Sequence, residues 1–192
     1  MNIIQPRENF KSDVEWYFSW WLDDFKKEGA INEWFYESNS FTLSDQQLYP
    51  VSKVMKTKIK IVTHELLKDH TYRPDFLVEW NEDWNKKLWR LVDDATCERK
   101  VKFFAVRSSK TGKPYTFFEV KGDFDRNNMT RLFTLNQKWL YSKYGLYVTL
   151  VKLPTLFKQT FVPERYFVTD KTMQERIINF PKMRVQQFLK QL

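Results

Sequence analysis

Two short stretches decide the fold that this sequence predicts: Tyr72-Arg73-Pro74-Asp75-Phe76-Leu77 and Phe118-Glu119-Val120-Lys121-Gly122. Both belong to runs of aromatic and β-branched residues that are typical of strands, and we expect strands over residues 75–80 and 115–121. Side chains alternate across a strand, so Glu119 and Lys121 should point to the same side. If the two strands are neighbours, Asp75 converges on this pair.

This grouping has a specific chemical use. Two carboxylates, Asp75 and Glu119, with the backbone carbonyl of Val120, form a hard oxygen site suited to Mg²⁺. Lys121 would orient or deprotonate a nucleophilic water, or stabilise charge on a phosphate. Each piece alone has a plainer reading, because Pro-Asp is a common turn and Glu-Lys a common exposed pair. Because the two motifs occur in this order and each lies on a predicted strand, we favour the metal-site interpretation.

The rest of the chain predicts an α/β protein with a mixed central sheet flanked by helices. Spacings of three and four predict an amphipathic helix over residues 10–28, with a capping box from Ser12 to Glu15 and a stop at Gly29. Further expected elements are β-type residues 31–43, a loop 44–53, a strand 54–68, a helix 127–144, a strand 146–152, and short helices 172–179 and 182–191. The strand–helix–strand unit 115–152 predicts a right-handed crossover.

Composition excludes several classes of protein. The 192 residues include 18% aromatics, which excludes a disordered chain. One cysteine, Cys97, and two histidines exclude a disulfide framework and a Cys- or His-rich metal site, and four glycines exclude P-loop and Rossmann chemistry. No apolar run approaches the ~20 residues that cross a bilayer, and no signal peptide is evident, so we expect a soluble, cytoplasmic protein with no membrane partner.

The charge is unevenly distributed along the chain. Residues 1–50 carry four basic and nine acidic residues, whereas residues 51–192 carry 28 basic and 15 acidic ones, within a net charge of +8. A clustered positive field attracts polyanions more strongly than a dispersed one. This asymmetry favours a nucleic-acid partner.

With these motifs in view, the sequence resembles the PD-(D/E)XK nuclease superfamily. Pro74-Asp75 followed by Glu119-Val120-Lys121 matches its signature, and the stretch from Phe10 to Glu15 is similar to the opening of phage Holliday-junction resolvases of the endonuclease I type. Related transposon end-cleaving nucleases and small uncharacterised phage nucleases share this similarity. It covers about residues 10–152, with gaps.

The resemblance implies a role for each matching residue. Asp75 and Glu119 would bind Mg²⁺ or Mn²⁺, Lys121 would be the catalytic lysine, and Glu15 would be an additional acid at the metal. Gln137 and Tyr141, spaced as Q-x-x-x-Y, resemble a fourth motif of such nucleases. The DNA contacts expected from the charge pattern are Lys56, Lys58, Lys60, Arg73, Arg126 and Arg131. The implied protein is a Mg²⁺-dependent endodeoxyribonuclease in bacterial or phage-infected cells. By analogy with the resolvases, branched DNA is its expected substrate and a homodimer its expected assembly.

The sequence departs from these resolvases in three places. A basic insertion occupies residues 81–113, residues 153–192 extend beyond the nuclease core of residues 1–152 and are expected to pack on it, and Glu15 is far from Asp75 in the chain. The alternatives are a restriction- or recombination-type nuclease on linear or single-stranded DNA, a non-catalytic nucleic-acid-binding or phage structural protein on the same fold, and a chance match in an interaction domain.

Overall fold

The computed structural model describes residues 5–97, 100–122, 129–169, 172–179 and 181–192. They form a mixed α/β fold around a six-stranded sheet of order β1-β6-β9-β8-β7, with β10 also paired to β9. The sheet strands are β1 (Ile31–Tyr36), β6 (Phe76–Trp80), β7 (Trp89–Leu91), β8 (Phe103–Arg107), β9 (Pro114–Lys121) and β10 (Val148–Lys152). β9 is antiparallel to β6 and β8 and parallel to β10, which confirms the expected mixed sheet.

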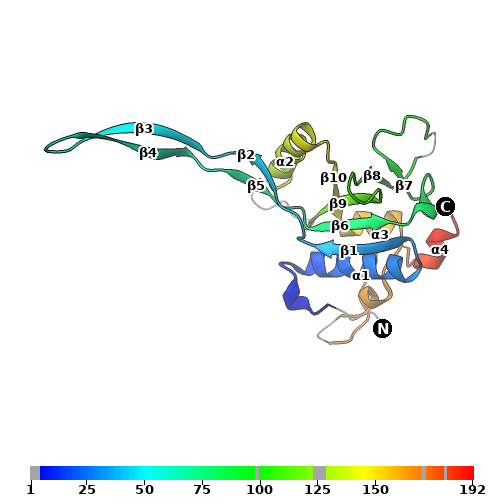
Figure 1. The fold of residues 1–192 in the computed structure, drawn as a ribbon. Coiled ribbons are helices and arrows are strands. Elements are labelled where there is room, and N and C mark those ends of the chain that lie inside the picture. The colour runs from blue at the N-terminus through cyan, green and yellow to red at the C-terminus, as the bar shows by residue number, and fades with distance from the viewer. Residues whose placement is uncertain (1–4, 98–99, 123–128, 170–171, 180) are drawn as a thin grey trace.

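Helices cover both faces of this sheet (Figure 1). One face carries α1 (Asp13–Lys27), and the other carries α2 (Met129–Tyr144). The remaining helical elements are α3 (Leu153–Gln159), α4 (Val185–Leu189) and the short 3₁₀ turns η1 (Arg7–Asn9), η2 (Glu82–Trp84) and η4 (Glu164–Phe167). In the part of the chain that the structure describes, no helix combines the length and apolar character needed to cross a membrane.

The first helix follows the prediction closely. The hydroxyl of Ser12 accepts the backbone N–H of Glu15, so Ser12 is the N-cap of α1. Gly29 follows the helix with φ of +72°, a conformation that favours glycine. The buried side of α1 packs Phe18, Trp21 and Phe25 into the larger core cluster.

The C-terminal segment joins the same core. Phe161 stacks on Trp21 with ring centroids 5.6 Å apart, and Phe157 and Phe188 are also buried in this cluster. α3 lies where no helix was expected, and its first turn contains Pro154, a position that proline fits. The helix expected over residues 172–179 was wrong: the described backbone there has no helical run, and Glu175 forms a bridge with Val168.

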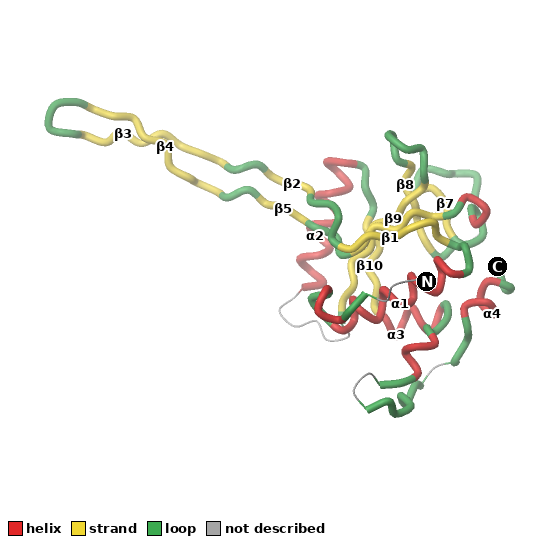
Figure 2. Tube along the Cα trace, turned by 60° about the horizontal axis from the view of Figure 1, so that its bottom comes forward, coloured by secondary structure: helices red, strands yellow, loops and turns green. Residues whose placement is uncertain are grey.

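The largest departure from the prediction is a hairpin that projects from the body (Figures 1 and 2). β2 (Phe41–Ser44) pairs with β5 (His70–Tyr72) at its base, and β3 (Gln47–Val54) pairs with β4 (Ile59–Leu67) beyond it. The loop expected over 44–53 was therefore wrong over most of its length. The strand expected over 54–68 is confirmed only from Ile59, because residues 55–58 form the turn. We call residues 47–67 the arm.

A buried hydrogen-bond relay connects three of the sheet strands. Trp80 Nε1 donates to Thr116 Oγ1 at 2.7 Å, and Thr116 Oγ1 donates to the carbonyl of Phe104 at 2.7 Å. Thr149, on β10, also buries its hydroxyl oxygen, but within the described residues that oxygen has no hydrogen-bond partner.

These two threonines give a matched stability test. We expect Thr116→Val to lower the free energy of unfolding by about 1–3 kcal/mol, because it leaves the buried Trp80 N–H unpaired. Thr149→Val makes the same chemical change without breaking a described hydrogen bond, so its stability should be unchanged or higher. Urea unfolding measures both. Equal losses of unfolding free energy in the two variants would show that the hydrogen bonds of Thr116 do not stabilise the fold.

Candidate active site

The pairing of β6 with β9 brings the predicted carboxylates together. Phe76 lies opposite Phe118, so Asp75, one residue earlier, lies opposite Glu119, one residue later. Both carboxylates are buried, and the backbone N–H of Val120 donates to Asp75 Oδ2 at 2.7 Å. The convergence of Asp75 and Glu119 expected from the sequence is therefore present in the structure.

Lys121 completes this group. Its Nζ lies 2.6 Å from Glu119 Oε1, and its side chain is 22% exposed. Burial lowers the pKa of Lys121, but its hydrogen bond to Glu119 and the charges of Glu119, Asp75 and Glu15 outweigh this effect, so the pKa is raised overall. Lys121 is therefore protonated at neutral pH, which suits it to stabilise negative charge rather than to accept a proton.

The pKa of Asp75 is also raised, which for a carboxyl group favours the neutral form. Burial and the nearby charge of Glu119 raise its pKa to about 7, with a further contribution from Glu15. The N–H of Val120 and the charge of Lys121 act against this shift. The positive charge around Asp75 does not offset the repulsion from the nearby carboxylates, and a cation bound beside it would relieve that repulsion.

Glu15 is buried and held by several donors. Its carboxylate accepts hydrogen bonds from the Ser12 hydroxyl at 2.8 Å, the Tyr36 hydroxyl at 2.6 Å and the Lys11 backbone N–H at 3.1 Å. Ser12 caps the helix as expected, but the Glu15 carboxylate accepts the Lys11 N–H and the Ser12 hydroxyl rather than the Ser12 N–H, so only half of the expected capping box is formed. The charge of Glu15 still contributes to the raised pKa of Asp75. Among the described residues, no group of three or more His, Cys, Asp or Glu side chains is gathered as a metal site.

The oxygen atoms of Asp75, Glu119 and Val120 are chemically suited to bind a divalent cation. Asp75 and Glu119 supply carboxylate oxygens, and the Val120 carbonyl belongs to β9, the strand that also carries Glu119. These are hard oxygen ligands of the kind that Mg²⁺ and Mn²⁺ accept, with water filling the other positions. Glu15 is not gathered with them, so its role as a ligand remains a prediction.

Two tyrosines at the site were not predicted. The Tyr72 hydroxyl donates to Glu119 Oε2 at 2.9 Å, and burial together with the charge of Glu119 raises the pKa of Tyr72. Burial and the hydrogen bond to Glu15 likewise raise the pKa of Tyr36. Both phenols therefore remain protonated donors that orient the carboxylates. Tyr72 stands in the quoted strand motif, but only the pairing of strands shows which group it reaches.

Cations lie at the edge of the site. Arg73, which is two residues before Asp75, has a side chain 53% exposed and 3.9 Å from Glu37. Lys11 also pairs with Glu37, and its side chain is 67% exposed. Glu37 has φ of 45°, unusual for a residue with a side chain, and its N–H donates to the Asp75 carbonyl at 2.8 Å. Arg73 and Lys11 are therefore exposed cations beside the site, and the phosphate contact expected of Arg73 stays a prediction.

The other predicted residues lie elsewhere. Gln137 donates to the Val148 carbonyl at the start of β10, and with Tyr141 it lines a cavity of about 440 Å³ whose walls include Phe104 and Tyr147. No described contact joins this pair to the carboxylates. Lys56, Lys58 and Lys60 are exposed at the end of the arm, Arg131 is exposed on α2, and Arg126 lies outside the described residues.

The electrostatics of Asp75 predict how stability depends on pH. Because its folded pKa of about 7 lies above the ordinary 3.8, the folded protein holds an extra proton between these values, and the free energy of unfolding falls as pH rises through them. Asp75→Asn removes this pH-dependent contribution to the free energy of unfolding and keeps an acceptor for the Val120 N–H.

Thermal melts in a metal chelator therefore give a direct comparison. We expect Asp75→Asn to melt several degrees above the wild type at pH 8 and to lose that advantage at pH 4. The exposed Asp45→Asn serves as control and should follow the wild type at both values. Parallel profiles for all three proteins would contradict the raised pKa.

Comparison with known proteins gives no further guide. No family model matches the chain, no curated protein matches it, and no solved structure matches it. An assignment of function therefore has to come from the geometry of Asp75, Glu119 and Lys121.

Proposed function

We propose that this protein is a metal-dependent endonuclease that hydrolyses DNA phosphodiester bonds. The observation that carries the proposal is the buried pairing of Asp75 with Glu119 across two adjacent strands, with the Lys121 ammonium 2.6 Å from Glu119. Opposed carboxylates and a protonated lysine are the groups that phosphoryl transfer requires.

In this proposal, Asp75, Glu119 and the Val120 carbonyl hold Mg²⁺ or Mn²⁺, with Glu15 as a further acid. The bound cation would supply Lewis acidity that activates water and neutralises charge on the phosphodiester. Lys121 stabilises the negative charge that develops on the phosphate, because its raised pKa keeps it protonated. Tyr72 orients Glu119 through its hydroxyl, and Tyr36 does the same for Glu15.

The surroundings support a polyanionic substrate. Lys11 and Arg73 lie exposed beside the site, and the arm carries exposed lysines at its far end. Lys53 lies directly opposite Lys60, an arrangement that is unfavourable unless negative charge lies nearby. Phosphates of a strand bound at the site would meet Lys11 and Arg73, and DNA that extended along the arm would meet its lysines.

The fold also supports this assignment. We infer that the mixed sheet, with α1 on one face and α2 of the strand–helix–strand unit β9-α2-β10 on the other, is a restriction-endonuclease-like core. A four-way DNA junction is the preferred substrate in this account, because the projecting arm would give the protein reach along a second duplex. Linear and single-stranded DNA are the competing substrates.

Cleavage assays test the proposal. Plasmid, single-stranded DNA and a four-way junction should be incubated with Mg²⁺ or Mn²⁺. We expect Asp75→Asn, Glu119→Gln and Lys121→Met each to lower the cleavage rate by at least about 100-fold, because the first two each remove a ligand of the proposed cation and the third removes the ammonium that stabilises the phosphate. DNA binding, measured in Ca²⁺ by gel shift, should persist in the variants.

The matched control is Glu65→Gln, which removes an exposed carboxylate from the arm and should retain activity. Wild-type protein that cuts none of the three substrates would overturn the enzyme assignment and favour a non-catalytic nucleic-acid-binding protein. Unchanged activity in the three site variants would overturn the site.

A further inference from the structure

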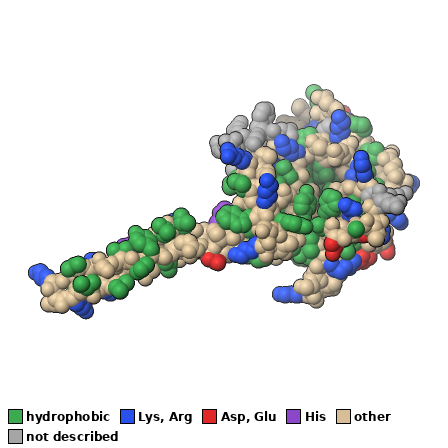
Figure 3. Space-filling view, turned by 90° about the horizontal axis from the view of Figure 1, so that it is seen from above, with side chains coloured by type: hydrophobic (Ala, Val, Ile, Leu, Met, Phe, Trp, Pro, Cys, Tyr) green, Lys and Arg blue, Asp and Glu red, His purple; other side chains and the backbone are tan. Residues whose placement is uncertain are grey.

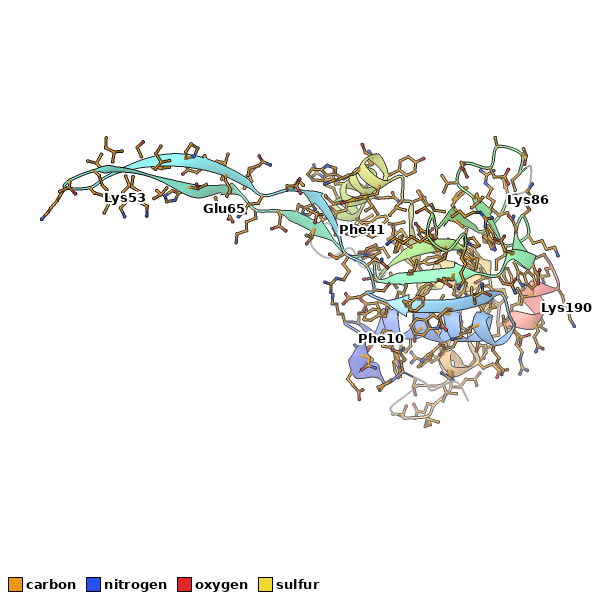
Figure 4. The ribbon with its side chains drawn as sticks, viewed as in Figure 1. Phe10, Phe41, Lys53, Glu65, Lys86 and Lys190 are labelled. Atoms are coloured by element: carbon orange, nitrogen blue, oxygen red, sulfur yellow. The ribbon has the colours of Figure 1, made fainter. Side chains whose placement is uncertain are left out.

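A cavity of about 440 Å³ opens on the α2 side of the sheet. It lies where two strands that pair with β9 separate, because β8 pairs with Pro114 and Tyr115, whereas β10 pairs with β9 from Phe117 onward. Figure 4 shows α2 above the sheet, with Phe41 beside it at the base of the hairpin. Figure 3 views the body from this side and shows hydrophobic and cationic side chains together on its surface. A cavity of this volume is in the range of small-molecule binding sites.

Aromatic rings form much of the wall of this cavity. Phe104 on β8 and Tyr147, which directly precedes β10, contact each other edge to face with ring centroids 5.7 Å apart, and both are half-buried. Tyr141 on α2 forms the facing wall and is 49% exposed. Partly exposed rings on both sides of a cavity provide flat apolar surfaces on which a planar ligand would stack.

The polar groups of the cavity come from one side of α2. Gln137 and Tyr141 are four residues apart, as are Lys138 and Ser142, so all four lie together on the helix surface. The Gln137 side-chain nitrogen donates to the Val148 carbonyl. In the part of the chain that the structure describes, the Gln137 side-chain oxygen accepts no hydrogen bond. One amide hydrogen and the amide oxygen are therefore available to a ligand.

The charge of the cavity is positive. Among the described residues that line it, Lys138 is the only charged one, and the exposed Lys138 ammonium has no ion pair in the described part of the chain. A cation without a nearby acid favours a ligand that carries negative charge. The absence of an acidic lining residue in the same part of the chain disfavours a cationic ligand.

We propose that this cavity binds a nucleotide, with its base stacked on Tyr141 and its phosphate beside Lys138. A nucleobase presents a hydrogen-bond donor next to an acceptor on its Watson–Crick edge, which complements the amide groups that Gln137 leaves available. A free nucleotide and an unpaired nucleotide of a nucleic acid offer this same chemistry. The proposal is independent of the proposed nuclease activity, because it uses none of the groups assigned to hydrolysis.

Isothermal titration calorimetry of the full chain in EDTA tests the site with three probes. AMP carries both the base and the phosphate, adenosine lacks the phosphate, and phenyl phosphate has an aromatic ring and a phosphate but no base edge. We expect AMP to bind at least about 10-fold more tightly than either of the other two compounds. Phenyl phosphate that bound as tightly as AMP would overturn the assignment of a base.

Two aromatic variants on α2 test the stacking contact. We expect Tyr141→Ala to weaken AMP binding by at least about 10-fold, because it removes a ring on which the base stacks. Trp139→Ala is the matched control, since Trp139 is also about half exposed on α2 but does not line the cavity. Its affinity for AMP should equal that of the wild type. Equal losses in the two variants would contradict stacking in the cavity.

A lysine variant tests the phosphate contact and replaces Tyr141→Ala if that protein does not fold. We expect Lys138→Gln to weaken AMP binding by at least about 5-fold and to leave adenosine binding unchanged, because only AMP carries the phosphate. Lys143→Gln, on the same helix but outside the cavity, should change neither affinity. Equal losses for AMP and adenosine in Lys138→Gln would contradict the phosphate contact.

Two DNA duplexes identify the source of the nucleotide. One carries a single unpaired adenine, and the other is fully paired, with binding measured by fluorescence anisotropy in EDTA. A preference for the unpaired adenine that Tyr141→Ala abolishes would assign the cavity to an unpaired nucleotide of a nucleic acid. AMP binding without this preference would assign it to a free nucleotide.

Failure of both assays would overturn the proposal. That result is no measurable heat with AMP at millimolar concentration, together with equal binding of the two duplexes. Because the assays contain no metal and measure no cleavage, this failure would leave the proposed nuclease activity untouched. Conversely, a protein that cleaves no DNA should still show the expected AMP binding.

Discussion

The antiparallel pairing of β6 with β9 is the constraint on which the rest of the structure depends. Its register places Phe76 beside Phe118, and the ring of Phe118 contacts Phe18 of α1 at 5.4 Å, so the same pairing seats the first helix on the sheet. One residue earlier than Phe76 and one residue later than Phe118, the same register places Asp75 opposite Glu119. A one-residue slip would turn one carboxylate to the other face and bury it without a partner.

The parts of the fold that the sequence predicts are those with strong local signals. The cap at Ser12, the apolar stripe of α1 and the left-handed Gly29 are set by neighbouring residues, and all three are confirmed. The opposed Asp75 and Glu119 were predicted for a different reason. Asp75 opens one strand with a clear pattern and Glu119 lies near the end of another, so only the assumption that the two strands are neighbours was required.

Features that depend on distant segments could not be predicted. The polar residues 44–46 and Pro50 favoured a loop over 44–53, yet residues 47–54 form β3 because β4 supplies the hydrogen bonds. The turn at residues 55–58 lacks the glycine or asparagine that usually marks a hairpin. Tyr72 and Tyr36 join the site only through tertiary contacts, and Gln137 turned out to bond a strand carbonyl.

The candidate active site carries more negative than positive charge. Two buried carboxylates share one ammonium group, and the pKa of Asp75 rises to about 7 because burial and Glu119 oppose its ionisation. Anomalous diffraction from a crystal soaked in Mn²⁺ tests this claim most directly. We predict a peak within ligand distance of both Asp75 and Glu119 that is lost in Glu119→Gln. A crystal with Mn²⁺ elsewhere and none between these carboxylates would contradict it.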